Sequence, residues 1–274
     1  MKMGVFGKAL AGLACATALL FGQEAPVAKQ PKPKSQKEAE AVMAVFNAQD
    51  PDARIAAAKD LETKFADTEF KSLARLMVAL SYQQKNDPDN MIIAAERTLE
   101  ADANNYQAML MIAEALAQRT RENDLDKEEK LARSEKMSNG AIASINAAAK
   151  PRPDITDEQW TGAKKDFAAQ AHQALGMAAM VRKKYDVAVA EFKTAVEGAT
   201  QPDPATMVRL GAVYNLAGKP DEAIAMLDKV MAVADLHPTI RQFAQAEKVR
   251  ATQAKGGAKP AAPASAPAQV EVKK

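Results

Sequence analysis

The sequence has one cysteine, two histidines and few aromatic residues, and each shortage removes a class of function. Aromatic side chains make up only 5% of the 274 residues. The lone cysteine, Cys15, lies in an apolar N-terminal run, so the rest of the chain can form neither a disulfide nor a cysteine-based metal site. His172 and His237 lie about sixty-five residues apart in the sequence, which does not suit a zinc site.

The familiar catalytic motifs are also missing. The sequence contains no HExxH, GxSxG, Walker or GxGxxG pattern. We interpret His172 as a packing or helix-surface residue and His237 as a turn or cap residue. We therefore expect no catalytic residues, no metal and no cofactor, and the protein is not expected to be an enzyme.

Charge of either sign is not in excess. There are 37 basic and 35 acidic residues, a formal charge of +2, and residues 1–22 carry two lysines and no acids, so the remainder is neutral. A near-neutral chain lacks the basic surface that nucleic acid requires, and we expect no nucleic-acid partner. The acidic run at 122–129 has no glycine in the register of a calcium loop, and we interpret it as a solvated helix start.

The first twenty-two residues resemble a secretory signal peptide. Two lysines precede an apolar run from Ala9 to Phe21 that is too short for a membrane span. We expect cleavage near Gly22, a mature chain without a membrane span, and a periplasmic or secreted location. An uncleaved N-terminal anchor, or a lipoprotein with its lipid on Cys15, remains an open alternative.

The composition of the chain divides the rest of it into three parts. Residues 23–35 form a Pro/Lys-rich linker, and residues 254–274 form an Ala/Pro-rich tail that we expect to be disordered because it has little to bury. The folded part is then 36–253. Apolar residues make up 47% of the chain, and strand alternation and hairpin turns are scarce, which favours an all-α fold.

Part of this region repeats itself after thirty-five residues. The matching positions are Gly176, Ala188 and Phe192 in one copy, and Gly211, Ala223 and Leu227 in the next. A glycine inside a helix costs roughly 1 kcal/mol relative to alanine. We therefore expect each glycine to lie where two helices cross closely, with the two alanines as the small partners.

The pattern resembles the tetratricopeptide repeat family, whose units are helical hairpins of about 34 residues. The resemblance is clearest over 169–235, where RLGAVYNLAGKPDEAIAMLDKV carries the signature, and it covers about 36–253. It implies an all-α, right-handed superhelical solenoid of about five antiparallel helix hairpins, closed by a capping helix at 238–253.

One hairpin departs from the period. Residues 121–139 interrupt the repeat and are interpreted as an insertion that lengthens a helix, with a kink expected at Ser138-Asn139-Gly140. Thr156 and Gln159 form a capping-box pattern, which predicts a long helix over about 157–182.

The resemblance also implies where a partner binds, because in this family the first helix of each hairpin lines a concave groove. Such a surface would be apolar, adaptable and rimmed by amides. The lysine/asparagine/arginine set with which chaperone-binding relatives grip a C-terminal carboxylate is missing, and Arg209 alone does not replace it. The implied partner-binding residues are Leu73, Leu76, Leu80, Leu110, Glu114, Gln173, Met177, Met180 and Asn215.

We therefore expect a non-enzymatic protein–protein interaction scaffold of the cell envelope, which binds a peptide or a partner helix through the concave face. The alternative is a structural subunit of an envelope assembly or secretion complex, acting through the insertion at 121–139 and the convex face. The sequence leaves the partner, the pathway and the oligomeric state open.

Overall fold

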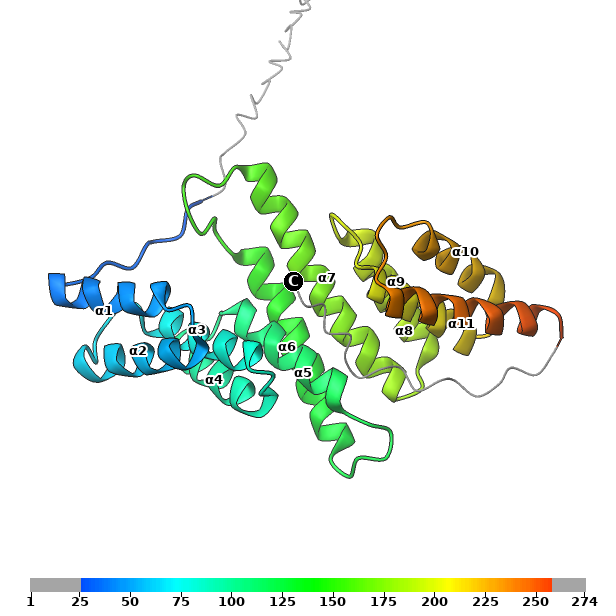
Figure 1. Ribbon diagram of the computed structural model, residues 1–274, viewed down its shortest axis with the longest axis horizontal. Helices are drawn as coiled ribbons and strands as arrows, with labels where there is room; N and C mark the ends of the chain where they lie inside the picture. Colours follow the sequence, from blue (N-terminus) through cyan, green and yellow to red (C-terminus); the bar gives the residue numbers. More distant parts are fainter. Residues whose placement is uncertain (1–25, 258–274) are drawn as a thin grey trace, which may run out of the picture.

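The computed structural model describes residues 26–257, which form eleven helices (Figure 1). The predicted signal peptide and the tail beyond Gly257 lie outside the described residues. The helices are α1 Gln36–Asn47, α2 Pro51–Lys64, α3 Lys71–Gln84, α4 Pro88–Ala101, α5 Tyr106–Arg119, α6 Lys127–Ala147, α7 Asp157–Val181, α8 Tyr185–Gly198, α9 Pro204–Leu216, α10 Pro220–Met231 and α11 Pro238–Lys255.

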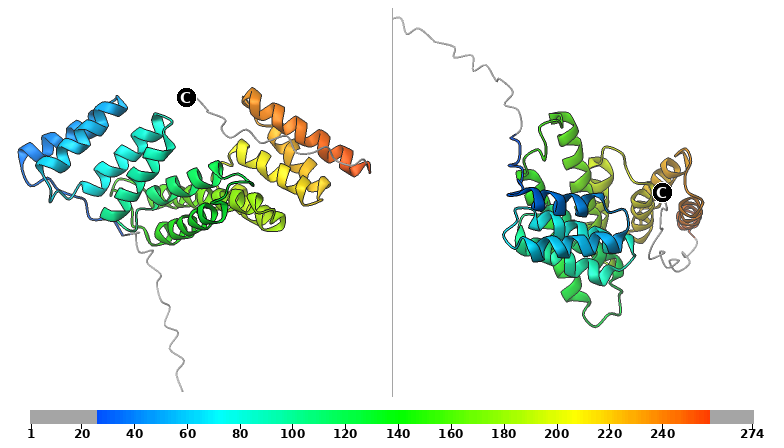
Figure 2. Two further views of the ribbon diagram at one scale, coloured as in Figure 1. Left: turned by 90° about the horizontal axis from the view of Figure 1, so that it is seen from below. Right: turned by 60° about the vertical axis from the view of Figure 1, so that its left-hand side comes forward.

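The first ten helices pair in order as five antiparallel hairpins, and α11 packs against both α9 and α10. Each second helix also packs on the first helix of the next hairpin, so the hairpins follow one another along an arc (Figure 2, left). Within residues 26–257 the only β-type pairing is a single bridge between Val27 and Lys150. The predicted all-α solenoid of right-handed superhelical type is confirmed.

The third and fourth hairpins contain the two longest helices. The α6 helix has 21 residues and α7 has 25, and both project beyond their neighbours in Figure 1. Residues 121–126 form the loop before α6, and the rest of the predicted insertion is the unbroken first part of that helix. The α6 helix is therefore continuous through Ser138-Asn139-Gly140, where the sequence predicts a kink. The capping box of Thr156 and Gln159 is present at the start of α7.

The same left-handed turn ends the first helix in three hairpins. One residue in each turn has a positive φ, and the amide of the residue that follows it donates to a carbonyl five positions back, which ends the helix and starts the return. The three positive-φ residues are Asn86 (53°), Lys183 (59°) and Gly218 (70°).

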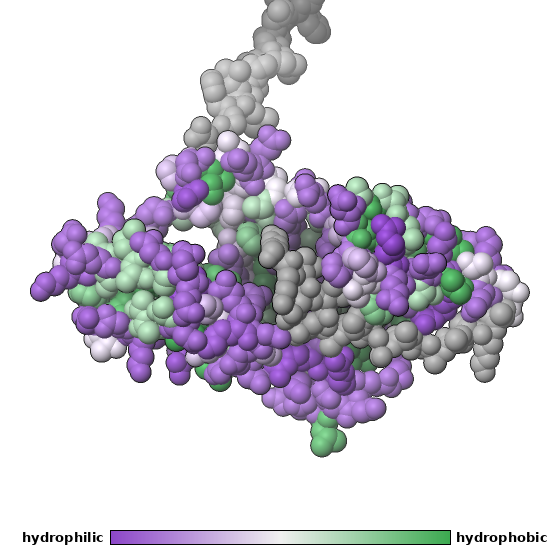
Figure 3. Space-filling view, in the orientation of Figure 1, coloured by the Kyte–Doolittle hydropathy of each residue, from purple (hydrophilic) through white to green (hydrophobic). Residues whose placement is uncertain are grey.

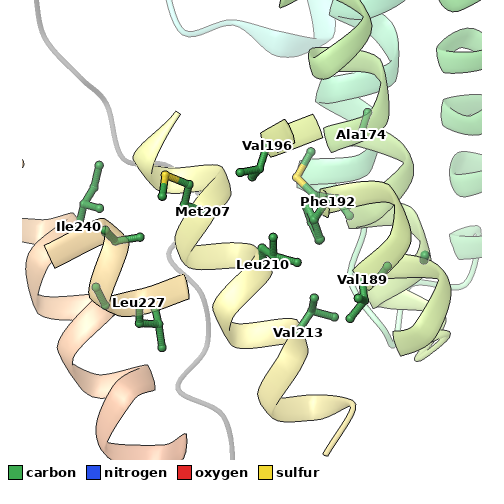
Figure 4. Close-up of a cluster of buried hydrophobic side chains, with 14 of the residues drawn as sticks. Ala174, Val189, Phe192, Val196, Met207, Leu210, Val213, Leu227 and Ile240 are labelled. Atoms are coloured by element: carbon green, nitrogen blue, oxygen red, sulfur yellow. The ribbon is translucent and has the colours of Figure 1, made fainter. Parts of the chain in front are cut away.

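The two repeated glycines lie at close helix crossings, as the sequence predicts. A Cβ on Gly176 would lie 3.0 Å from the Phe192 ring, and a Cβ on Gly211 would lie 2.7 Å from Leu227. Each glycine therefore makes room for a large side chain from the second helix of its own hairpin. Phe192 and Leu227 belong to one core that runs from α5 to α11 and is drawn in part in Figure 4.

The small partners predicted for these glycines need a correction. Ala188 and Ala223 are fully buried, but the atoms nearest to each missing Cβ belong to the larger side chains one turn further along the same helix. The crossing is close because a glycine faces a large residue, and the alanine is not its closest contact.

A ladder of ion pairs runs along one edge of the solenoid, with one pair at every junction. In four pairs a basic residue at or just beyond the end of a helix meets an acid in the first turn of the preceding second helix, where the partial charges of both helix ends favour these signs. In the fifth pair the acid, Glu122, lies in the loop before α6. Each exposed pair contributes only about 0–1 kcal/mol, so packing between the helices, and not this ladder, supplies most of the stability of each junction. The pairs are Lys85–Asp52, Arg119–Asp89, Lys183–Glu122, Lys219–Asp186 and Lys255–Asp221.

The segment before α1 runs along the outside of the first three hairpins. At one end the Ala28 amide donates to the Lys150 carbonyl between α6 and α7, at 2.7 Å. At the other end the Lys34 ammonium pairs with the Asp67 carboxylate between α2 and α3, at 2.5 Å. Residues 26–34 therefore bridge the first hairpin to the long third and fourth hairpins.

Replacing Gly211 with alanine should destabilise the protein, because the new methyl group would overlap the Leu227 side chain. We expect a loss of roughly 1–2 kcal/mol, since overpacking outweighs the gain in helix propensity. Chemical unfolding followed by circular dichroism would measure it. Gly198→Ala is the control, because no atom lies within 4 Å of its added Cβ, and it should be neutral or stabilising. An unchanged midpoint for Gly211→Ala would contradict the close crossing.

Candidate functional site

Polar side chains from three first helices gather on the inner side of the arc. The charges of Arg209 and Asp203, both at α9, act on Glu114 of α5, although α7 lies between these two helices in the row. Helices two hairpins apart approach each other only on the inner side of a curved array, so these residues face the concave side. We call this set the concave cluster: Glu114, Gln118, Gln173, Asp203, Thr206 and Arg209.

Glu114 is the most desolvated acid of the concave cluster. Burial raises the pKa of the Glu114 carboxyl, and this effect outweighs the opposing charge of Arg209 and the hydrogen bond from Gln118. The Gln118 amide donates to Glu114 Oε1 at 2.7 Å. A carboxylate held in this way is a strong acceptor for a cationic or N–H group that enters the groove.

Thr206 connects α9 to α7. Its hydroxyl lies 2.5 Å from Gln173 Oε1 and 2.8 Å from Asp203 Oδ2. A hydroxyl has one proton and can donate to only one of these oxygens at a time. When the hydroxyl donates to Asp203 Oδ2, which also accepts from the Thr206 amide at 2.9 Å, Gln173 Oε1 can accept from a ligand.

Arg209 supplies the positive charge of the cluster. Its side chain is half-buried on α9, and within residues 26–257 it forms no ion pair. A guanidinium without a carboxylate partner can donate several hydrogen bonds in a fixed fork to carbonyl or carboxylate oxygens. The concave cluster therefore offers both a donor and an acceptor on rigid helices.

Two small cavities adjoin this cluster. One, of about 140 Å³, lies beside Glu114 and Gln118 and is also lined by Met91 and Met111. The other, of about 150 Å³, lies between α7 and α9 and is lined by Gln173 and Thr206, among others. Small-molecule and cofactor sites are usually larger, about 300–1,000 Å³. These cavities match the side chains of a bound peptide better than a cofactor.

Residues 26–257 contain neither a metal-binding cluster nor a membrane-spanning helix. Within residues 26–257 no group of three or more histidine, aspartate or glutamate side chains could hold a metal ion. No helix in that range is both long and apolar enough to cross a bilayer.

No family model matches the sequence, and no curated protein matches it. Solved structures do match in fold, and two of them illustrate the similarity. The crystal structure of MamA protein has a TM-score of 0.51 and 14% identity, covering 71% of this chain and 90% of that one. TTC0263, described as a thermophilic TPR protein in Thermus thermophilus, has a TM-score of 0.51 and 13% identity, covering 78% and 98%. The fold is of the tetratricopeptide repeat type.

The predicted partner-binding residues of this tetratricopeptide-type solenoid fall into two groups. Three of them are buried between helices and do not face the groove, which corrects the prediction that they are exposed there: Leu76 (4% exposed), Leu110 (6%) and Met177 (8%). The others are exposed or half-buried: Leu73, Leu80, Glu114, Gln173, Met180 and Asn215.

Each buried residue packs within a hairpin or against the next one. Leu76 belongs to the core between α3, α4 and α5, and Leu110 contacts the core of α6 and α7. Met177 is part of the core that includes α8 to α11. Asn215 is half-buried, but its amide donates to the Glu247 carbonyl and carboxylate, both at 3.0 Å, and so joins α9 to α11. Of the nine, the structure brings Glu114 and Gln173 into the concave cluster.

Sequence reasoning missed most of the concave cluster, although signals for two members were present. Gln118 lies one helical turn after Glu114, on the same face of α5. Thr206 follows Gln173 by 33 residues, which is close to one repeat. The sequence draws attention to Arg209, but its neighbours on α5 could be identified only from the curvature of the array.

Replacing Glu114 with glutamine should change how stability depends on pH. The folded state binds the Glu114 proton more tightly than the unfolded state, so wild-type stability falls as pH rises above the usual glutamate pKa of about 4.3 towards the raised pKa. Glutamine does not titrate, so the Glu114→Gln variant does not lose stability in this way as pH rises. Its stability relative to wild type should grow across that interval, as measured by urea unfolding at several pH values. A difference that stays constant with pH would show that Glu114 is not desolvated.

Proposed function

We propose that the protein is a non-enzymatic interaction scaffold of the cell envelope, which binds a peptide or helix of a partner protein on its concave face. The concave cluster carries this proposal, because it places a desolvated acid and an unpaired arginine on helices two hairpins apart. Two side-chain-sized cavities beside it support a peptide ligand. The envelope location rests on the signal-like sequence of residues 1–22.

The mechanism is complementarity to a surface that exists before binding. Arg209 would donate to carbonyl or carboxylate oxygens of the partner, and Glu114 would accept from an N–H or a cationic group. Leu73, Leu80 and Met180 are exposed or half-buried on first helices and would provide apolar contact. Helices that do not need to order on binding keep the entropic cost of association low.

Replacing Arg209 with alanine should reduce capture of the partner about tenfold or more, the usual loss for a central arginine. A photo-crosslinking residue would replace Gln170, an exposed residue beside the α7–α9 cavity, in the full chain in its own cells. Crosslinked products from the envelope fraction would be quantified with and without Arg209→Ala. We expect one dominant product, lost in the variant.

Two controls make this test specific. Lys229→Ala removes an exposed positive charge from α10, outside the concave cluster, and should leave crosslinking unchanged. A crosslinker at Glu197, exposed on the second helix α8, should not give the dominant product. A product that forms equally from both crosslinker positions, or that survives Arg209→Ala, would contradict binding on the concave face.

A second candidate is a structural subunit of an envelope assembly or secretion complex. The projection of α6 and α7 beyond the other helices favours it (Figure 1), and the end formed by the α5–α6 loop is mostly hydrophilic (Figure 3). Deleting 121–139 would be a poor test, because Leu131, Ser134 and Ser138 of that range are buried. Replacing the loop residues 122–125 with glycine and serine tests this surface instead. If the envelope complex is lost in this variant but kept in Arg209→Ala, the second candidate is favoured.

A further inference from the structure

An open groove separates α2 from α4 on the second-helix side of the first two hairpins. Its volume is about 750 Å³, several times that of either cavity beside the concave cluster. The α2 and α4 helices form its walls and one face of α3 forms its floor. The hairpins that contain it lie at one end of the arc (Figure 2, left). Its apolar lining consists of Ile55, Ala58, Val78, Ile93 and Ala94, with Tyr82 beside them.

Small residues and one arginine shape this groove. Ala58 and Ala94 line the facing walls, so no large side chain fills the space between α2 and α4. Arg75, from α3, pairs with Glu62 of α2 at 3.0 Å and with Glu100 of α4 at 3.3 Å. This arginine connects both walls and neutralises part of the acidic charge of the groove.

The groove is left with exposed apolar surface and unpaired positive charge. Ile93 is 46% exposed, which is high for an isoleucine in a packed repeat. Lys59 and Arg97 are exposed on opposite walls, and within residues 26–257 neither forms an ion pair. A ligand that suits this groove carries an apolar side chain between acidic ones.

The chain itself contains such a segment. Leu125, in the loop between α5 and α6, is fully exposed at 107% of its reference area. Asp124 and Asp126 flank it and share Lys130, at 3.6 and 2.8 Å. Glu122 and Glu128, close by in the sequence, pair with Lys183 and Arg182 at the end of α7. Residues 121–130 carry five acids and three bases, so this protruding apolar side chain has a net negative surrounding that complements Lys59 and Arg97.

We propose that the α2–α4 groove of one copy receives the α5–α6 tip of a second copy. Leu125 would enter between Ile55 and Ile93, and the flanking aspartates would face Lys59 and Arg97. The α5–α6 tip and the second helices α2 and α4 lie on the same, lower side of Figure 1, so two copies can exchange tips and close a dimer. One-way contact would instead give open chains.

A folded tip suits this groove better than an extended peptide, because a folded tip loses less conformational freedom on binding. A tip anchored on two helices brings its own hydrogen bonds and its side chains in a fixed arrangement. The contact is small, so the association should be weak and should weaken further with salt.

Sedimentation of the purified full chain over a wide range of concentration tests the proposal. We expect reversible association that is lost in Leu125→Ser, whose side chain contributes nothing to the core of its own chain. Lys59→Glu/Arg97→Glu should abolish it as well. Lys165→Glu/Lys229→Glu changes the same charge at exposed positions outside the groove and should associate as the wild type does. Circular dichroism would check that every variant is folded.

A charge exchange makes the test specific to this pair of surfaces. Lys59→Glu/Arg97→Glu has an acidic groove and an acidic tip, and Asp124→Lys/Asp126→Lys has a basic groove and a basic tip. Neither variant should associate alone, and an equal mixture should form a mixed dimer. A chain that stays monomeric at all concentrations would overturn the proposal. So would association that persists in Leu125→Ser, or a partner protein found in the groove while the chain itself is monomeric.

Discussion

The contact between each second helix and the first helix of the next hairpin is the interaction on which the rest of the structure depends. An isolated hairpin leaves one apolar face open, and only its neighbour covers it. In this chain such contacts join every hairpin to the next, and α11 covers the last one. The glycine crossings hold two of these hairpins together internally. Gly176 and Gly211 leave room for Phe192 and Leu227 at the centre of their hairpins. A change in one crossing therefore alters the surface that the next hairpin packs on.

Periodicity in the sequence predicts the order of helices well, but it predicts the direction of individual side chains less well. The five hairpins, the capping box at Thr156 and the cap at α11 all follow from local patterns. Consecutive residues of a helix are roughly 100° apart around its axis. A position that faces the groove is therefore next in sequence to one that faces the core. An expected groove position such as Leu110 can thus be a core position. It is buried because Ala141 and Ile145 of α6 and Ala171 of α7 pack against it.

The concave cluster and the ion-pair ladder join residues of different repeats, so the pattern within a single repeat does not reveal them. Arg209 acts on Glu114 only because the array bends enough to bring α9 towards α5. The ladder uses an acid at the start of four second helices, and its partner is about one repeat away in the sequence. Its regular spacing is visible in the sequence once the structure shows which positions meet. The α2–α4 groove has no such signal, because it arises from alanines where a repeat could hold larger residues.

The two surfaces proposed for this protein are compatible because they use different helices. The concave cluster lies on first helices of the third to fifth hairpins, and the α2–α4 groove lies mainly on second helices of the first two. A tip seated in the groove of a second copy therefore leaves both concave clusters uncovered. A dimer with two open clusters would bind a partner that displays two or more copies of a peptide far more tightly than either cluster alone, since the second contact becomes intramolecular. Weak self-association at the groove would in this way increase affinity at the concave face without any new contact there.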